Sequence, residues 1–190
     1  MRTFLIVLLM LYSIGWSFAS TIVVCQTSVL PNGLVCTFND IQKAINYAKP
    51  GDTIKVYGGF YKENIFIDKP LTLLGFNLPV IDGNHKGDVI KSTSSDVRIE
   101  GFVIENSGRS DIQDLAGIKF IAPDTKYVEN CTIANNIIKD NFFGIWIGNA
   151  KGCVIKNNII KGPLNPSEVL SGNGIHLWHC KHMLVANNII

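Results

Sequence analysis

CTIANNIIKD at 131–140 returns as CVIKNNIIKG at 153–162 and as MLVANNII at 183–190. The first two copies align at Asn136 and Asn158, which are 22 residues apart. A period near 22 residues, built from short β-branched stretches between turn residues, is too short for a propeller blade and wrong for helical repeats. It predicts an all-β chain wound as a right-handed parallel β-helix, in which each coil is three short strands joined by turns.

A second series of segments precedes each copy of the repeat: GIKFI (117–121), GIWIG (144–148) and GIHLW (174–178). The alternating isoleucines and valines are expected to fill the interior. Paired asparagines suit the turns, because asparagine tolerates the left-handed conformation and stacked amides hydrogen-bond from coil to coil. An antiparallel sandwich is the alternative fold, but it does not require three aligned motifs at nearly fixed spacing.

The N-terminal segment has the pattern of a secretory signal peptide over residues 1–19. Arg2 supplies the positive region, residues 4–14 the apolar core, and residues 17–19 a cleavage pattern of small residues. An uncleaved membrane anchor is the alternative, although the apolar run is short for a span. Residues 20–53 are then an N-terminal arm with a capping helix, and residues 54–190 are the β-helix repeats.

One helix is expected in NDIQKAINYAKPGD at 39–52, which carries apolar residues at helical spacing: Ile41, Ala44, Ile45 and Ala48. Asn39 is the expected N-cap with Gln42 as its capping-box partner, and Pro50 stops the helix. This helix would cover the open N-terminal end of the stack, where unpaired strand edges need protection. The pattern is interrupted at Ile190, so we expect further coils and a cap beyond this residue.

Five cysteines are present, and export permits disulfides. Cys25 and Cys36 are close together ahead of the helix and are the expected pair. Cys131, Cys153 and Cys180 lie in repeat positions, where buried thiols are expected. The odd count leaves at least one cysteine unpaired or paired outside this chain.

The composition limits the function classes. The chain has 190 residues, 47% of them hydrophobic and 17% charged, with a net charge of +2. This composition is not that of a disordered chain, and the charge gives no argument for nucleic acid as a partner.

One column of outward side chains is a candidate ligand groove. If the isoleucines of the second series point inward, then Lys119, Trp146 and His176 point outward from successive coils, about 4.8 Å apart. Trp178 follows on the same side, and two long loops flank the column and carry acidic residues: Asp111, Asp114 and Glu168. Loops on a rigid scaffold are where binding residues concentrate. The alternative is an ordinary solvated face.

The segment HLWHCKHM at 176–183 is a candidate metal site. Imidazole, thiolate and thioether groups are ligands for Cu(I), and five of them occur here: His176, His179, Cys180, His182 and Met183. Zinc spacing such as Cys-x-x-Cys is absent. In the alternative interpretation Cys180 and Met183 pack inward and the histidines are solvated.

No catalytic pattern is evident. Uronate-cleaving β-helices need clustered carboxylates for acid–base chemistry or for calcium, and the carboxylates here are scattered along the sequence. We therefore expect a protein that is not an enzyme.

Several segments resemble the NosD family: AINYAKPGDTIKVYGGFYKENIFIDKPLTLLGF (44–76), IDGNHKGDVI (81–90), VRIEGFVIENSG (97–108), DLAGI (114–118) and GNGIHLW (172–178). The resemblance implies a pectin-lyase-like β-helix in the periplasm that assists assembly of the copper centre of nitrous-oxide reductase. It implies an ABC-type ATPase and permease, a copper chaperone and the reductase as partners, and no catalysis by this chain.

A second hypothesis remains open from the residues alone. Trp146 and Trp178 could stack on sugar rings, which would make the chain a carbohydrate-binding or polysaccharide-acting protein. The first hypothesis predicts metal binding, and the second predicts glycan binding without copper dependence.

Overall fold

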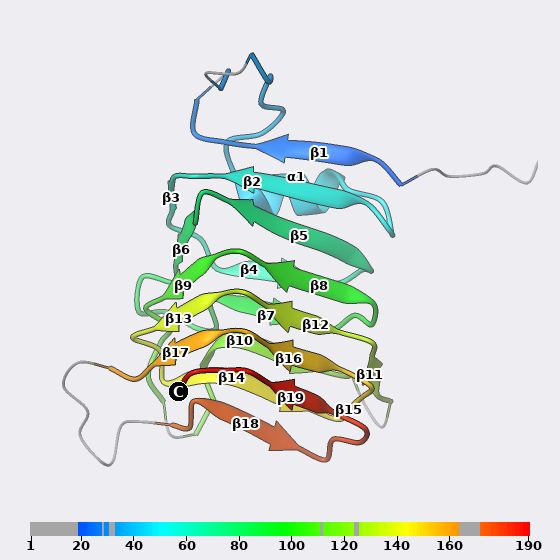
Figure 1. Cartoon of the computed structure of the whole chain (residues 1–190), viewed down its shortest axis with the longest axis vertical. Coiled ribbons are helices and arrows are strands. Elements are labelled where there is room, and N and C mark those ends of the chain that lie inside the picture. Colours follow the sequence, from blue (N-terminus) through cyan, green and yellow to red (C-terminus); the bar gives the residue numbers. More distant parts are fainter. Residues whose placement is uncertain (1–18, 28, 31–32, 111, 124–125, 164–171) are drawn as a thin grey trace, which may run out of the picture.

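The computed structural model describes residues 19–27, 29–30, 33–110, 112–123, 126–163 and 172–190 (Figure 1). These residues wind into a right-handed parallel β-helix, which confirms the predicted fold. Each coil passes through three sheets in a fixed order, and the strands of successive coils pair in parallel along the long axis.

We number the three main sheets in the order in which each coil enters them. Sheet 1 holds β1 (Thr21–Val24), β2 (Thr53–Tyr57), β5 (Leu71–Phe76), β8 (Val97–Glu100), β12 (Thr132–Ala134), β16 (Val154–Lys156) and β19 (Leu184–Ala186). Sheet 2 holds β3 (Phe60–Tyr61), β6 (Val80–Asp82), β9 (Val103–Glu105), β13 (Ile137–Lys139) and β17 (Ile159–Lys161). Sheet 3 holds β4 (Ile65–Ile67), β7 (Ile90–Ser92), β10 (Ala116–Ile121), β14 (Phe143–Gly148) and β18 (Ile175–Trp178). A two-stranded sheet pairs β11 (Val128–Glu129) with β15 (Ala150–Lys151).

The apolar columns fill the interior as the repeat predicts. Ile118 aligns with Ile145, Phe120 aligns with Ile147, and all four side chains are fully buried. Residues at the same position in successive coils therefore stack on one another inside the solenoid, and this stacking forms one continuous core.

The turn between sheets 1 and 2 is the same in successive coils, and we call it the asparagine corner (residues 101–102, 135–136, 157–158 and 187–188). The first residue of each pair has a positive φ, from 54° to 86°, which asparagine and glycine tolerate. The second asparagine points inward. The Asn136 amide donates to Asn158 Oδ1 at 3.1 Å, and the Asn158 amide donates to Asn188 Oδ1 at 2.9 Å. The predicted ladder of amides is therefore present.

The first coil is covered by α1 (Ile41–Tyr47), whose buried residues are Ile41, Ala44 and Ile45. Asp40, not Asn39, caps this helix, because its carboxylate accepts from the Lys43 N–H. Gln42 is not a capping-box partner either; its side chain bonds the backbone of Phe66 in sheet 3. The N–H groups of Ile41 and Gln42 donate instead to the Glu63 carboxylate at 2.9 Å.

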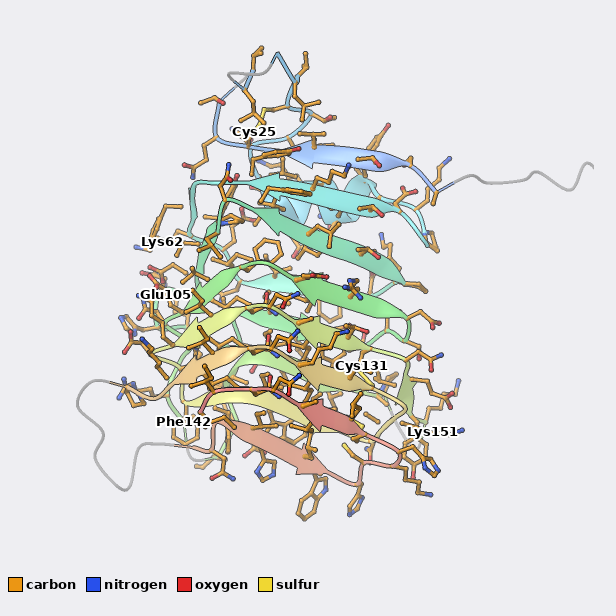
Figure 2. All side chains as sticks on the ribbon, in the orientation of Figure 1. Cys25, Lys62, Glu105, Cys131, Phe142 and Lys151 are labelled. Carbon is orange, nitrogen blue, oxygen red and sulfur yellow. A yellow bond between two sulfur atoms is a disulfide. The ribbon has the colours of Figure 1, made fainter. Side chains whose placement is uncertain are left out.

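Two disulfides are present. Cys25 and Cys36, the expected pair, are joined beside β1, with their Cα atoms 5.8 Å apart. Cys131 and Cys153 are also joined, with Cα atoms 4.6 Å apart, so the prediction that they are free thiols is wrong. Figure 2 shows Cys25 at the N-terminal end of the stack and Cys131 further along it. Cys180 is the free cysteine.

The last described coil is less covered than the first. Leu177, Val185 and Ile190 are 37%, 45% and 74% exposed, whereas the equivalent inward residues of earlier coils are buried. The signal peptide predicted at 1–19 lies outside the described residues except for its final residue. Within the described part of the chain, no helix is long and apolar enough to cross a membrane.

Candidate functional site

The predicted column exists in sheet 3. Lys119 of β10 aligns with Trp146 of β14, which aligns with His176 of β18. Lys91 of β7 occupies the same position one coil earlier. The three predicted residues therefore share one outward position in successive coils, as the spacing of the second series predicts.

Trp146 lies flat between its two neighbours in the column. The Lys119 ammonium is 4.8 Å from the centroid of the Trp146 ring, and the His176 ring is nearly parallel to it, at 6.1 Å and 8°. Gly148, two residues along the same strand, makes room for the indole, because a Cβ atom there would be 2.5 Å from the ring. The second glycine of GIWIG is thus a sequence signal for the orientation of this tryptophan, and sequence reasoning missed it.

Lys119 and Trp146 are 8% and 7% exposed, so they do not lie on the ordinary solvated face that was the alternative to a ligand groove. The Lys119 ammonium donates to the backbone carbonyls of Gln113 and Asp114, at 3.0 Å each. These carbonyls belong to the loop between β9 and β10, which the ammonium holds against the column. The side chain that was expected to contact a ligand therefore fastens a loop and supports Trp146.

A hollow of about 490 Å³ opens beside the column, lined by Asp114, Ile121, Trp146, Gly148, Asn149, His176 and Trp178. His176 Nδ1 is 3.2 Å from the Asn173 amide, and Trp178 is 54% exposed. Rings form much of the wall, and Asp114 supplies a carboxylate. Asp111 and Glu168, the other acidic residues predicted for the groove, lie outside the described residues. The hollow can hold a small ligand or a side chain of a partner between aromatic surfaces and polar groups.

Asp88 is a further residue of this face that the groove prediction did not include. Its Oδ1 accepts from the Ala116 N–H at 2.9 Å, at the start of β10. Burial raises the pKa of the Asp88 carboxyl, although the Lys119 ammonium and this hydrogen bond act in the opposite direction. The carboxyl therefore positions the strand that carries Lys119.

The five candidate metal ligands do not converge on one point. His179 and His182 are turn residues with φ values of 50° and 52°, and they occupy the positions that Asn149 and Gly152 hold one coil earlier. The ring of His179 stacks on Trp178 at 4.8 Å. These two histidines thus continue columns of left-handed turn residues.

The sulfur-bearing candidates point the other way. Cys180 and Met183 pack against the core, and the Cys180 thiol donates to the carbonyls of Ile147 and Trp178 at 3.4 Å. In the described ranges, no three His, Cys, Asp or Glu residues are grouped so that they could hold a metal ion. The inward position of Cys180 and Met183 agrees with the alternative interpretation of this segment.

Two curated proteins named "Probable ABC transporter binding protein NosD" are similar to this chain. The protein from Pseudomonas aeruginosa is 31% identical over 130 residues, and that from Stutzerimonas stutzeri is 27% identical over 130 residues. Both alignments cover 68% of this chain, which spans 29% of the length of each relative. The predicted resemblance to NosD proteins is therefore confirmed as a sequence similarity.

Other matches have different names. A cell surface glycoprotein of Methanothermus fervidus is 30% identical over 162 residues, covering 81% of this chain and 25% of that protein. Among solved structures, pectin methylesterase PemA from Erwinia chrysanthemi matches with a TM-score of 0.48 and 14% identity, covering 89% of this chain and 81% of its own. A pectin methylesterase in complex with a hexasaccharide matches with a TM-score of 0.47 and 14% identity, covering 77% of this chain and 67% of its own. No family model matches the chain.

Proposed function

We propose that this chain is the β-helix part of a non-catalytic accessory protein that works with an ABC-type ATPase and permease. The similarity over 130 residues to two proteins named as probable ABC transporter binding proteins carries this proposal. A stack of coils joined by parallel strand pairing suits such a role, because it holds a surface in a fixed shape against a partner.

In this proposal the protein acts in the periplasm, where it assists assembly of the copper centre of nitrous-oxide reductase together with a copper chaperone. Export would follow from the signal peptide predicted at 1–19. The two disulfides support an oxidising compartment, since disulfides persist there and are rare in the cytosol. Copper is the cargo of this process and not a resident cofactor of the chain.

The hollow beside Trp146 is the proposed contact surface for a partner. Its rim carries the exposed Trp178, and its wall carries His176 and Asp114. Tryptophan at a rigid surface is a frequent anchor of protein interfaces, because it buries a large area with little loss of conformational freedom. Lys119 stabilises this surface because its ammonium donates to the carbonyls of Gln113 and Asp114 in the adjoining loop.

Deletion of the gene in the organism that carries it tests the proposal. We expect nitrous-oxide reductase purified from the deletion strain to lack copper and activity, and the wild-type gene to restore both. A reductase with its full copper content in the deletion strain would contradict the proposed function.

Carbohydrate binding is a second candidate, favoured by the exposed Trp178 beside the stacked rings of Trp146 and His176. Such rings are platforms for sugars. A glycan array with the purified chain distinguishes the two functions. The carbohydrate candidate predicts binding that does not depend on copper and that is lost in Trp178→Ala, and an array without specific binding rejects it.

A further inference from the structure

Three sulfur-bearing side chains occupy one inward column at the start of sheet 1. Cys131, Cys153 and Met183 directly precede β12, β16 and β19, whose residues are aligned partners in successive coils. In the two coils before them, the same column holds Leu71 and Val97. The column therefore changes from aliphatic to sulfur-bearing residues over its last three described coils.

The two cysteines of this column are buried, and Met183 is partly buried. Cys131 and Cys153 are 0% and 1% exposed, and Met183 packs against the core cluster that contains both of them. The Cα distance of 4.6 Å across the disulfide is close to the strand spacing of about 4.8 Å. Met183 is the next residue of the column, one coil beyond Cys153, so the three sulfur-bearing side chains start from neighbouring strands of sheet 1.

The disulfide is not needed to set the register of these coils. The Val154 N–H donates to the carbonyl of Cys131 at 2.8 Å, and the Leu184 N–H donates to that of Cys153 at 3.0 Å. Backbone hydrogen bonds therefore already align the three coils. A second role for the cysteine pair is compatible with the fold, because the column can open its S–S bond while the sheet remains paired.

We propose that reduction of the Cys131–Cys153 disulfide converts this column into a binding site for one soft cation of the Cu(I) class. The ligands are the thiolates of Cys131 and Cys153 and the thioether of Met183. Thiolate and thioether sulfur select Cu(I), and the thiolate, not the disulfide, is the metal-binding form of cysteine. The inference deepens the proposed function and rests on it for the identity of the cargo.

The redox step needs a dithiol reductant. One thiolate of the reductant attacks a sulfur of the Cys131–Cys153 bond, this bond breaks, and the reductant leaves as a disulfide. Two electrons and two protons pass to the cysteines in the process. Metal binding then releases the thiol protons to solvent, so affinity falls as pH falls.

Cys180 serves as an internal control for this site. It lies outside the sulfur column, and its thiol donates to the carbonyls of Ile147 and Trp178. His182 is a second control, because it is a turn residue at a position where other coils carry asparagine or glycine. Both residues belong to the five-ligand set predicted from the sequence, so the two candidate sites can be separated by mutation.

Titration of Cu(I) against a chromophoric chelator, under anaerobic conditions, tests the inference on the full chain. We expect the dithiol-reduced protein to bind one equivalent and the oxidised protein to bind none. Met183→Leu conserves volume and leaves the disulfide intact, and it should weaken binding by the reduced protein about tenfold or more, which is about 1.4 kcal/mol. Cys153→Ser should abolish binding, whereas Cys180→Ser and His182→Asn should bind as the wild type does.

Several outcomes would overturn the inference. These are binding by the oxidised protein, no binding by the reduced protein, binding that appears only after the β-sheet circular dichroism signal is lost, and binding unaffected by Met183→Leu. Loss of binding in Cys180→Ser or His182→Asn would support the five-ligand set instead. The titration reports on this site alone, whereas the copper content of the reductase in the deletion strain reports on the proposed function.

Discussion

Two corners of the same solenoid differ in a way that separates scaffold from site. The asparagine corner, between sheets 1 and 2, repeats with the same backbone conformation in successive coils and with the same amide hydrogen bonds from Asn136 to Asn188. The connection between sheets 2 and 3, which we call the loop corner (residues 106–115, 140–142 and 162–174), differs in its number of residues at each coil, and residues 111 and 164–171 of it lie outside the described residues. Lys119 donates to carbonyls of the loop corner, and Asp114 of this corner lines the hollow together with residues of sheet 3. The uniform turns keep successive coils aligned, whereas a variable turn adds a polar residue, Asp114, to the hollow.

The largest effect is expected at the asparagine corner. The Asn158 side chain accepts from the backbone and amide of Asn136 and donates to the Ile133 carbonyl, all without exposure to solvent. Asn158→Ala leaves these buried groups unpaired and should lower the free energy of unfolding by about 3 kcal/mol, measured by urea denaturation. The neighbouring Asn157→Gly keeps the positive φ and should change it by less than about 0.5 kcal/mol. Equal effects of the two variants would contradict the ladder.

A smaller effect is expected at the loop corner. Lys119→Met removes the donor to the Gln113 and Asp114 carbonyls and should lower the free energy of unfolding by about 1 kcal/mol. It should also shift the tryptophan fluorescence, because the ammonium lies over the Trp146 ring. Lys91→Met alters the same column one coil earlier and is the matched control. If both variants behave alike, Lys119 does not hold the loop.

The smallest effect concerns the pH dependence of Asp88. Its pKa is raised in the folded protein, so its contribution to stability is fully present below the unfolded pKa and is lost as pH rises through the folded pKa. Asp88→Asn keeps an oxygen acceptor for the Ala116 N–H and cannot ionise. We expect this variant to be more stable than the wild type at pH 7 and equally stable below about pH 4, by urea denaturation at both values. A variant that is less stable at pH 7 would show that the charge is needed there.

Much of the scaffold was predictable from spacing alone. The 22-residue period places Asn136 over Asn158, and the recurrence of the Gly-Ile motif in the second series places Ile118 beside Ile145, because equal positions in successive coils stack. The same period also predicts the second disulfide. Cys131 and Cys153 are also 22 residues apart, and stacked positions about 4.8 Å apart lie within the Cα range of a disulfide.

The site was predictable only in outline. The alignment of Lys119 with Trp146 followed from the repeat, but their burial did not, because the covering loop lies outside the repeat and its path depends on tertiary contacts. The histidines near the last coil suggested a metal site. His179 and His182, however, occupy left-handed turn positions, which Asn149 and Gly152 occupy one coil earlier. Asn39 and Asp40 are adjacent candidates for the helix cap, and spacing does not distinguish them.

The claim that function resides at the hollow on the outer face of sheet 3 is tested most directly by complementation of the deletion strain. A His176→Ala/Trp178→Ala double variant alters the hollow, whereas Asn157→Gly alters the asparagine corner and leaves the hollow intact. We expect the double variant to be exported and folded but unable to restore the copper content of nitrous-oxide reductase, and Asn157→Gly to restore it fully. Full restoration by the double variant would contradict the account.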